Sequence, residues 1–187
     1  MNEGQLDGLL EALFQDVGEA QRQLAAADSQ YCRRAYVRAV FASVEAFLFW
    51  MKHQALIEHQ RFSAGELSMI CEENYSVDAT GKLLAQPKFI PLDHNFRFVA
   101  SVYLHRDHLP LAVDWGDSGW ADFRTGLKVR HRLTHPKSGR DLEVSDDDLG
   151  RIRRGHAFVM AIVLTQFAKA LRSVAAIDAN RERSDGA

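Results

Sequence analysis

Apolar residues recur every three or four positions along most of the chain, which is the pattern of amphipathic helices. The fullest apolar stripe lies in a helix expected from near Ser29 to about His59, and it consists of Val37, Val40, Val44, Leu48, Met51 and Ala55, widened by Phe41 and Phe47. An earlier helix has a stripe of Leu6, Leu9, Leu13, Val17 and Leu24. Several long helices with narrow apolar faces predict an all-α fold, an antiparallel helical bundle.

Capping and turn signals divide the middle of the chain. Ser63 is followed three residues later by Glu66, a capping box that predicts a short helix to about Glu73. The "DATG" turn signal at 78–81 separates two β-leaning runs, so we expect a small hairpin inserted at about 74–92. Helices are expected again from Asn95 to Asp107 and from near Ser118.

The last helix is expected to begin after Ser145, with Asp148 three residues on as its capping partner. Its stripe consists of Leu149, Ile152, His156, Val159, Val163, Phe167, Ala170 and Val174. The polar residues 179–187 predict a flexible tail. We therefore expect one helical domain over residues 1–178, with the hairpin as a small insertion.

Composition narrows the class of protein without naming a function. The 187 residues are 47% hydrophobic and 26% charged, with a net charge of -2, which predicts a globular protein and leaves room only for a local basic patch. The acidic N-terminus lacks the layout of a signal peptide, and the longest apolar run is too short to span a bilayer. Cys32 and Cys71 are expected as free thiols, so we expect a cytoplasmic protein and no membrane partner.

The stretch "KVRHRLTHPKSGRD" at 128–141 carries the strongest candidate chemistry. Arg130 continues the apolar stripe of Trp120, Phe123 and Leu127, where a permanent charge is unfavourable unless it is paired. Glu45, at the margin of the apolar face of its own helix, is a candidate partner. The residue types alone favour a buried structural ion pair, and a functional site is the alternative.

His135 is the second unusual residue of this stretch. Pro136 disfavours helical geometry before it, so the helix should end by Thr134 and allow His135 to turn back. A regular helix would place Arg130 and His135 on different faces. Beside a helix C-terminus, the partial negative charge favours a protonated imidazole. No acid lies between Arg124 and Arg140, and the run contains Arg124, Lys128, Arg130, Arg132, Lys137 and Arg140.

One histidine and one arginine are suited to RNA cleavage. RNA supplies its own nucleophile, the 2′-OH, so the protein must supply a proton acceptor or donor near neutral pH and a cation for the phosphorane. No metal or other cofactor is required. The R-x4-H spacing by itself occurs by chance in many proteins.

The wider string makes the motif more specific. "RHRLTHP" at 130–136 resembles the R-x(4–6)-H motif of the HEPN superfamily, and His131 matches the polar residue that usually follows the arginine. "VRHRLTHPKSGRDLEVSDDDL" and the upstream "RAVFASVEAFLFWMK", which contains Glu45, look like one branch of that superfamily. The hairpin suits the same branch, and the resemblance covers roughly residues 30–175.

The resemblance implies a HEPN-like helical bundle that forms a two-fold dimer. Many members are metal-independent endoribonucleases that act as toxins or phage-defence effectors. Arg130 would then stabilise the scissile phosphate, and His135 would transfer a proton or orient the 2′-OH. His131, Glu45 and Thr134 would support them. In a dimer, the working arginine and histidine can come from different subunits.

One departure from the family bears on regulation. Toxins silenced by a partner nucleotidyltransferase commonly carry a tyrosine two residues after the histidine, where this chain has Lys137. Silencing by modification of that tyrosine is therefore not expected. Another antitoxin or regulatory partner, or none, stays open.

Other functions for this chain stay open. A non-catalytic RNA-binding or nucleotide-binding HEPN module is the alternative, although inactive members usually lose the arginine or the histidine. Plausible phosphate contacts, which would look the same as a solvated helix end, are Lys128, Arg132, Lys137 and Arg140.

A metal site at His94, His105 and His108 is not expected, because no carboxylate-rich pattern or cysteine pair completes it. His156 is expected as a satisfied core histidine, or else in the cleft. The tryptophans are expected mainly in the core, with an exposed Trp115 as the alternative for that residue: Trp50, Trp115 and Trp120.

Overall fold

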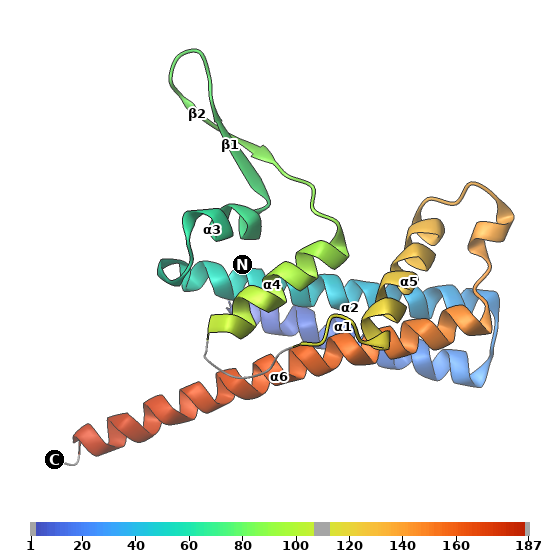
Figure 1. The fold of residues 1–187 in the computed structure, drawn as a ribbon. Coiled ribbons are helices and arrows are strands. Elements are labelled where there is room, and N and C mark those ends of the chain that lie inside the picture. Colours follow the sequence, from blue (N-terminus) through green and yellow to red (C-terminus); the bar gives the residue numbers. More distant parts are fainter. Residues whose placement is uncertain (1–2, 107–112, 186–187) are drawn as a thin grey trace.

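The structure, a computed structural model, describes residues 3–106 and 113–185, and over these residues it is mostly helical (Figure 1). The α-helices are α1 (Glu3–Ala26), α2 (Gln30–Ile57), α3 (Ala64–Cys71), α4 (Leu92–Arg106), α5 (Ser118–Thr134) and α6 (Asp146–Asp185). Two short 3-10 helices, η1 (His59–Arg61) and η2 (Gly139–Leu142), precede α3 and α6. The strands β1 (Glu73–Val77) and β2 (Leu83–Pro87) form an antiparallel hairpin.

The long helix α2 supplies the centre of the core. Its whole predicted stripe, from Val37 to Ala55, is buried, as are Phe41 and Phe47. Helix α1 lies along α2, and Phe14 meets Phe47 edge to face with ring centroids 5.0 Å apart. The predicted stripe of α1 is wrong at Leu9, which is exposed, because the buried face runs through the neighbouring Leu10.

Helices α5 and α6 cross at very short range, and the closest approach lies in the N-terminal half of α5, at Asp122 and Phe123. A Cβ on Gly155 of α6 would lie 2.5 Å from the backbone nitrogen of Phe123, so only glycine allows this approach. Asp122 lies beside the crossing and is nearly buried. Its carboxylate accepts hydrogen bonds from Arg154 Nε at 2.6 Å and from Arg151 Nη1 at 3.3 Å.

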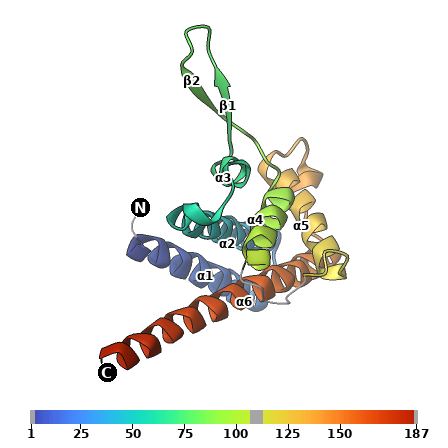
Figure 2. The same cartoon turned by 60° about the vertical axis from the view of Figure 1, so that its left-hand side comes forward.

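The β-hairpin stands away from the helices in both views (Figures 1 and 2). Its strands pair from Glu73 opposite Pro87 to Val77 opposite Leu83, which confirms the predicted insertion. The base is attached to the helical body at Glu72, the left-handed C-cap of α3 with φ 54°. Glu72 pairs with Lys52 of α2 and accepts a hydrogen bond from Asn95 Nδ2 of α4 at 2.6 Å.

The predicted helix boundaries at capping residues are confirmed. Ser29 caps α2, and Ser63 forms a complete capping box with Glu66. Ser145 and Asp148 exchange backbone and side-chain hydrogen bonds at the start of α6. Helix α5 ends at Thr134, as Pro136 predicts.

Helix α6 continues through residues 179–185 to Asp185, because nothing in the sequence up to that point breaks the helix. The flexible tail expected at 179–187 stays a prediction. The end of α4 predicted at Asp107 lies outside the described residues. Neither Cys32 nor Cys71 is in a disulfide. No helix in the described ranges has an apolar stretch long enough to cross a bilayer.

Candidate functional site

Arg130 lies on α5 between two surface grooves. One groove, the α4–α5 groove, has a volume of about 570 Å³ and runs between the start of α4 and the exposed side of α5. The other, the α2–α5 groove, measures about 400 Å³ and lies between α2 and the end of α5. Arg130 lines both grooves, so a chain that passed from one groove to the other at this position would meet its guanidinium.

Glu45 is the ion-pair partner of Arg130. Its Oε1 lies 2.6 Å from Arg130 Nη2, which brings together two residues 85 positions apart in the sequence. The pair is half-exposed rather than buried, with side-chain exposures of 38% for Arg130 and 44% for Glu45. An ion pair this accessible contributes about 0–1 kcal/mol to stability. The Arg130–Glu45 ion pair therefore contributes little to the stability of the fold.

His131 and His135 form a histidine pair at the end of α5. His135 is the C-cap residue, with φ -127° and ψ 62°, and its backbone N–H donates to the carbonyl of His131 at 3.0 Å. The two imidazole rings are 5.2 Å apart. His131 lines the α4–α5 groove beside Arg130, and the exposed His135 is its neighbour outside the residues that line the groove.

Arg130 and His135 are not bonded to each other within one chain. Among the described residues, no hydrogen bond or ion pair joins them, as expected for residues five positions apart near the end of a helix. Thr134 donates its hydroxyl to the carbonyl of Arg130 at 2.9 Å and lines the α2–α5 groove. The predicted site residues thus lie on one end of α5, with Glu45 supplied by α2.

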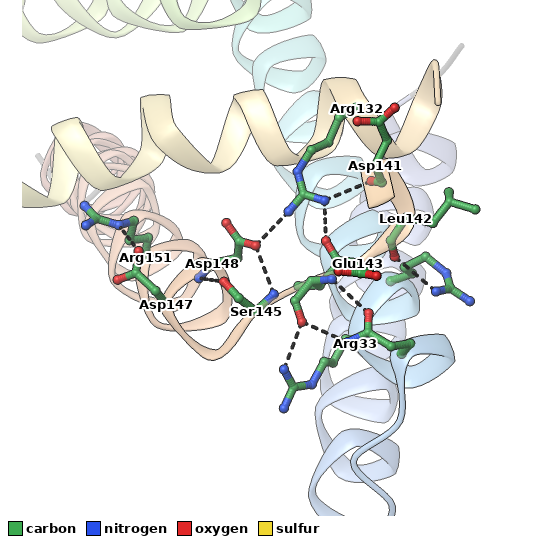
Figure 3. Close-up of polar contacts among 12 residues, drawn as sticks. Arg33, Arg132, Asp141, Leu142, Glu143, Ser145, Asp147, Asp148 and Arg151 are labelled. Carbon is green, nitrogen blue, oxygen red and sulfur yellow. Dashed lines mark hydrogen bonds and ion pairs between the residues drawn. The ribbon is translucent and has the colours of Figure 1, made fainter. Parts of the chain in front are cut away.

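Arg132 ties the segment after α5 to α6 (Figure 3). Its guanidinium donates to the carbonyls of Asp141, at 2.8 Å, and Glu143. It also pairs with Asp148 of α6 at 2.6 Å. These contacts occupy Nη1 and Nη2 and leave Arg132 few N–H donors for a phosphate. A role for Arg132 in binding RNA phosphate stays a prediction.

The start of α2 holds the same segment from the other side. Gln30 accepts from the backbone N–H of Val144 at 2.8 Å and donates to the carbonyl of Val144 at 3.1 Å. Arg33 and Arg34 donate to the carbonyls of Val144 and Leu142. Sequence reasoning missed these three donors, and the only available signal was their grouping directly after the Ser29 cap.

The other predicted phosphate contacts remain accessible. Lys128 is exposed and lines the α4–α5 groove next to Arg124, whose Nε lies 3.3 Å from Asp93. Lys137 and Arg140 are exposed on the segment after α5. The backbone N–H of Lys137 donates to Asp141 at 2.8 Å and lowers the pKa of that carboxyl.

His156 is the histidine on the apolar stripe of α6. Burial lowers the pKa of His156, which agrees with a position in the core. The structure shows no hydrogen-bond partner for its buried Nε2 among the described residues, and a satisfied core position for this histidine stays a prediction.

The tryptophans lie mainly within the packed aromatic groups. Trp120 is buried, and Trp115 is partly buried against it, with ring centroids 4.8 Å apart. Trp50 packs partly buried against the core. The Arg97 guanidinium covers the Trp115 ring at 5.5 Å, which leaves this ring little free face for stacking.

The described side chains contain no group of three or more metal-ligating residues. His94 Nε2 lies 3.9 Å from the Asp93 carboxylate. The side chains of His105 and His108 lie outside the described residues. The two grooves at Arg130 are lined by cations, by His131 and by the carboxylates of Glu45 and Asp93.

No protein-family model, no curated protein and no solved structure matches this chain.

Proposed function

We propose that this chain is a metal-independent endoribonuclease of the HEPN type that works as a homodimer. The observation that carries the proposal is the accessible Arg130, which lines two grooves and lies beside the His131–His135 pair. A fixed cation and an imidazole are the two groups needed to cleave RNA through its own 2′-OH.

The proposed reaction uses few protein groups. An imidazole accepts the proton of the 2′-OH, whose oxygen attacks the adjacent phosphorus. The bond from phosphorus to the 5′ oxygen breaks, and that oxygen takes a proton, leaving a 2′,3′-cyclic phosphate and a 5′-OH. Arg130 stabilises the extra negative charge on the phosphorane oxygens. His135 performs one proton transfer, and His131, 5.2 Å away between ring centroids, supports it.

The two-fold dimer is part of the proposal because of the separation of Arg130 and His135 within one chain. Two copies related by a two-fold axis would place Arg130 of one subunit opposite His135 of the other. Action as a toxin or phage-defence effector, with an antitoxin or other regulatory partner, rests on the family resemblance. Lys128, Lys137 and Arg140 are the proposed phosphate contacts, and Arg132 is the weakest of the four.

A non-catalytic RNA-binding module is the second candidate. Two observations favour it: Arg130 is paired with Glu45, and no hydrogen bond joins His135 to Arg130 among the described residues. In that case the grooves would bind RNA phosphates without cutting the strand.

Cleavage of total cellular RNA in EDTA separates the two candidates. We expect the wild-type protein to cut RNA and both Arg130→Ala and His135→Ala to lose the activity while keeping their circular dichroism spectra. Arg22→Ala and His59→Ala are matched controls, because both residues are exposed and lie on other elements.

The possible results decide between the candidates. A folded wild type that binds RNA but cuts none supports the binding module and contradicts the nuclease. Variants that cut as well as wild type place the activity outside this site.

A further inference from the structure

Phe89 is the most exposed large apolar residue described in the chain, at 90%. It lies between β2 and α4 and forms part of the rim of the α4–α5 groove, the groove that also contains Arg130 and His131. A phenylalanine ring with this exposed fraction takes no part in packing the folded core. Its position at a groove with candidate catalytic residues points to a ligand.

The backbone on both sides of Phe89 is held in place. The N–H of Lys88 donates to the carbonyl of Glu72 at 2.6 Å, and Lys88 Nζ lies 3.0 Å from Met69 Sδ. On the other side, the carbonyl of Pro91 accepts the N–H of Asn95 at 2.9 Å as α4 begins. The ring is therefore presented from an anchored segment, which lowers the entropy lost when a ligand covers it.

The α5 wall of the groove carries three cations, and Leu92 and Leu127 add apolar surface to the groove. Arg124 and Lys128 lie one helical turn apart, and Arg130 follows Lys128 by two residues. Asp93 also lines the groove, 3.3 Å from Arg124, and offsets part of this positive charge. Positive charges that follow a phosphate backbone, next to an aromatic ring on which a base can stack, are the features of a site for single-stranded nucleic acid. In a duplex the base faces are stacked on one another and unavailable to a side chain.

We propose that Phe89 stacks on an unpaired nucleobase of RNA bound in the α4–α5 groove, so that the substrate is single-stranded next to the cleavage position. This inference rests on the proposed function, because it takes Arg130 as the group that meets the scissile phosphate. The α5 cations hold the flanking phosphates, and Phe89 holds one base and sets the register of the strand.

Binding of a labelled RNA oligonucleotide of about ten nucleotides tests the inference, since single-strand sites cover about 4–16 nucleotides. Fluorescence anisotropy is measured in EDTA with the full-length chain carrying His135→Ala, which keeps the RNA intact. Phe89→Ala, Phe89→Trp and Val77→Ala are each added to this background. Val77 is the matched control, an exposed apolar residue on β1 outside the groove lining.

Phe89→Ala should weaken binding of the single strand about 5- to 150-fold, the range for loss of one base–aromatic stack. Phe89→Trp should keep the affinity, and Val77→Ala should not change it. The same RNA annealed to its complement should bind Phe89→Ala and its parent equally well.

Other results overturn the inference in distinguishable ways. An unchanged affinity in Phe89→Ala, with weaker binding in Arg130→Ala, removes the stacking role and leaves the proposed function standing. Equal losses for single and double strands, together with a change of oligomeric state in light scattering, would assign Phe89 to contact with a second copy. If the parent binds no RNA and the wild type cuts none, the stacking role and the proposed function both fail.

Discussion

At the scale of single residues, the Glu45 carboxylate and a phosphate of bound RNA would compete for Arg130. Its Nη2 is 2.6 Å from the Glu45 carboxylate, and a phosphate bound at the same guanidinium would bring a second negative charge close to Glu45. Two like charges about 4 Å apart repel by about 1 kcal/mol in water and more in a partly dry groove. Glu45 therefore pairs with Arg130 in the free protein, and in the proposed function it would weaken phosphate binding there.

Replacing this carboxylate should show the competition. Glu45→Gln is expected to raise RNA affinity about 5-fold, the effect of removing about 1 kcal/mol of repulsion. Stability should change by less than about 1 kcal/mol, because the pair is half-exposed. Anisotropy with RNA and thermal unfolding measure the two effects.

Glu58→Gln is the matched control for this change. Glu58 pairs with Arg61 at the same 2.6 Å distance and with similar exposure, away from the residues that line either groove. Glu58→Gln should change RNA affinity and stability very little. A lower RNA affinity in Glu45→Gln would instead show that the carboxylate is needed to position Arg130 for phosphate.

At the scale of elements, the end of α5 is positioned by its crossing with α6 and by the segment that follows it. The close approach at Gly155 and the Asp122 ion pairs hold α5 against α6. Arg132 then attaches the segment up to Glu143. His135 lies between these two attachments. This candidate catalytic histidine therefore has a non-helical backbone conformation, and the chain on both sides of it is held in place.

The Asp122 attachment should depend on pH. The hydrogen bond from Arg154 holds the pKa of this carboxyl below its usual value, despite an opposing effect of burial. The folded state therefore favours the charged form, and the resulting stabilisation is present above the usual carboxyl pKa of about 4. It is lost as the pH falls through the lower pKa of the folded state.

Asp122→Asn should accordingly destabilise the fold by about 1–3 kcal/mol at neutral pH, the effect of losing charged hydrogen bonds at a buried site. The difference from wild type should shrink as the pH falls below about 4, where the wild-type carboxyl also becomes protonated. Urea unfolding over a pH series measures both.

Asp147→Asn is the control for the same arginine. Asp147 pairs with Arg151 at 2.8 Å but has a side-chain exposure of 70%, so its loss should change stability by less than about 1 kcal/mol. A destabilisation by Asp122→Asn that is the same at every pH would mean that packing at the helix crossing, and not charge, accounts for it.

At the scale of the whole molecule, the proposed reaction is shared between two subunits. Arg130 and His135 lie on the same end of α5, no hydrogen bond joins them among the described residues, and both are accessible at the surface. A dimer that joins these ends would complete two sites at once.

Mixed dimers test this arrangement. Arg130→Ala and His135→Ala subunits should each be inactive alone, but a mixed dimer would contain one complete site, with Arg130 from one subunit and His135 from the other. Random mixing makes about half of the dimers mixed, so about a quarter of the wild-type activity should return. Unfolding the two variants together and refolding them supplies the mixture.

In the control, the two variants are mixed without exchange of subunits. This mixture should stay inactive. No recovery after verified exchange would place the working arginine and histidine in one subunit. It would then require His135 to move toward Arg130 when RNA binds.

Much of the fold could be predicted from the sequence because its signals are local. The caps at Ser29, Ser63 and Ser145 depend on residues within one helical turn, and the end of α5 depends on the ring of Pro136. The α2 stripe follows from the helical repeat. The hairpin follows from its turn residues, of which Gly81 has the left-handed φ of 83°.

What the sequence could not decide depends on distances between remote residues. Leu9 and Leu10 fit the α1 repeat equally well, and only the packing against α2 buries Leu10. Arg130 and Arg132 have the same charge and lie two positions apart on one helix. One is an accessible cation between two grooves, and the other is bound to the segment before α6.

By itself, the sequence determined the helical class, most element boundaries and the short run that contains the candidate chemistry, because these follow from neighbours along the chain. Only the tertiary structure decided which arginine is available, that Glu45 meets Arg130 across 85 positions, and that Phe89 lies at the same groove. Those contacts depend on how α2, α4 and α5 pack in three dimensions, and the periodicity of one helix carries no information about the position of another.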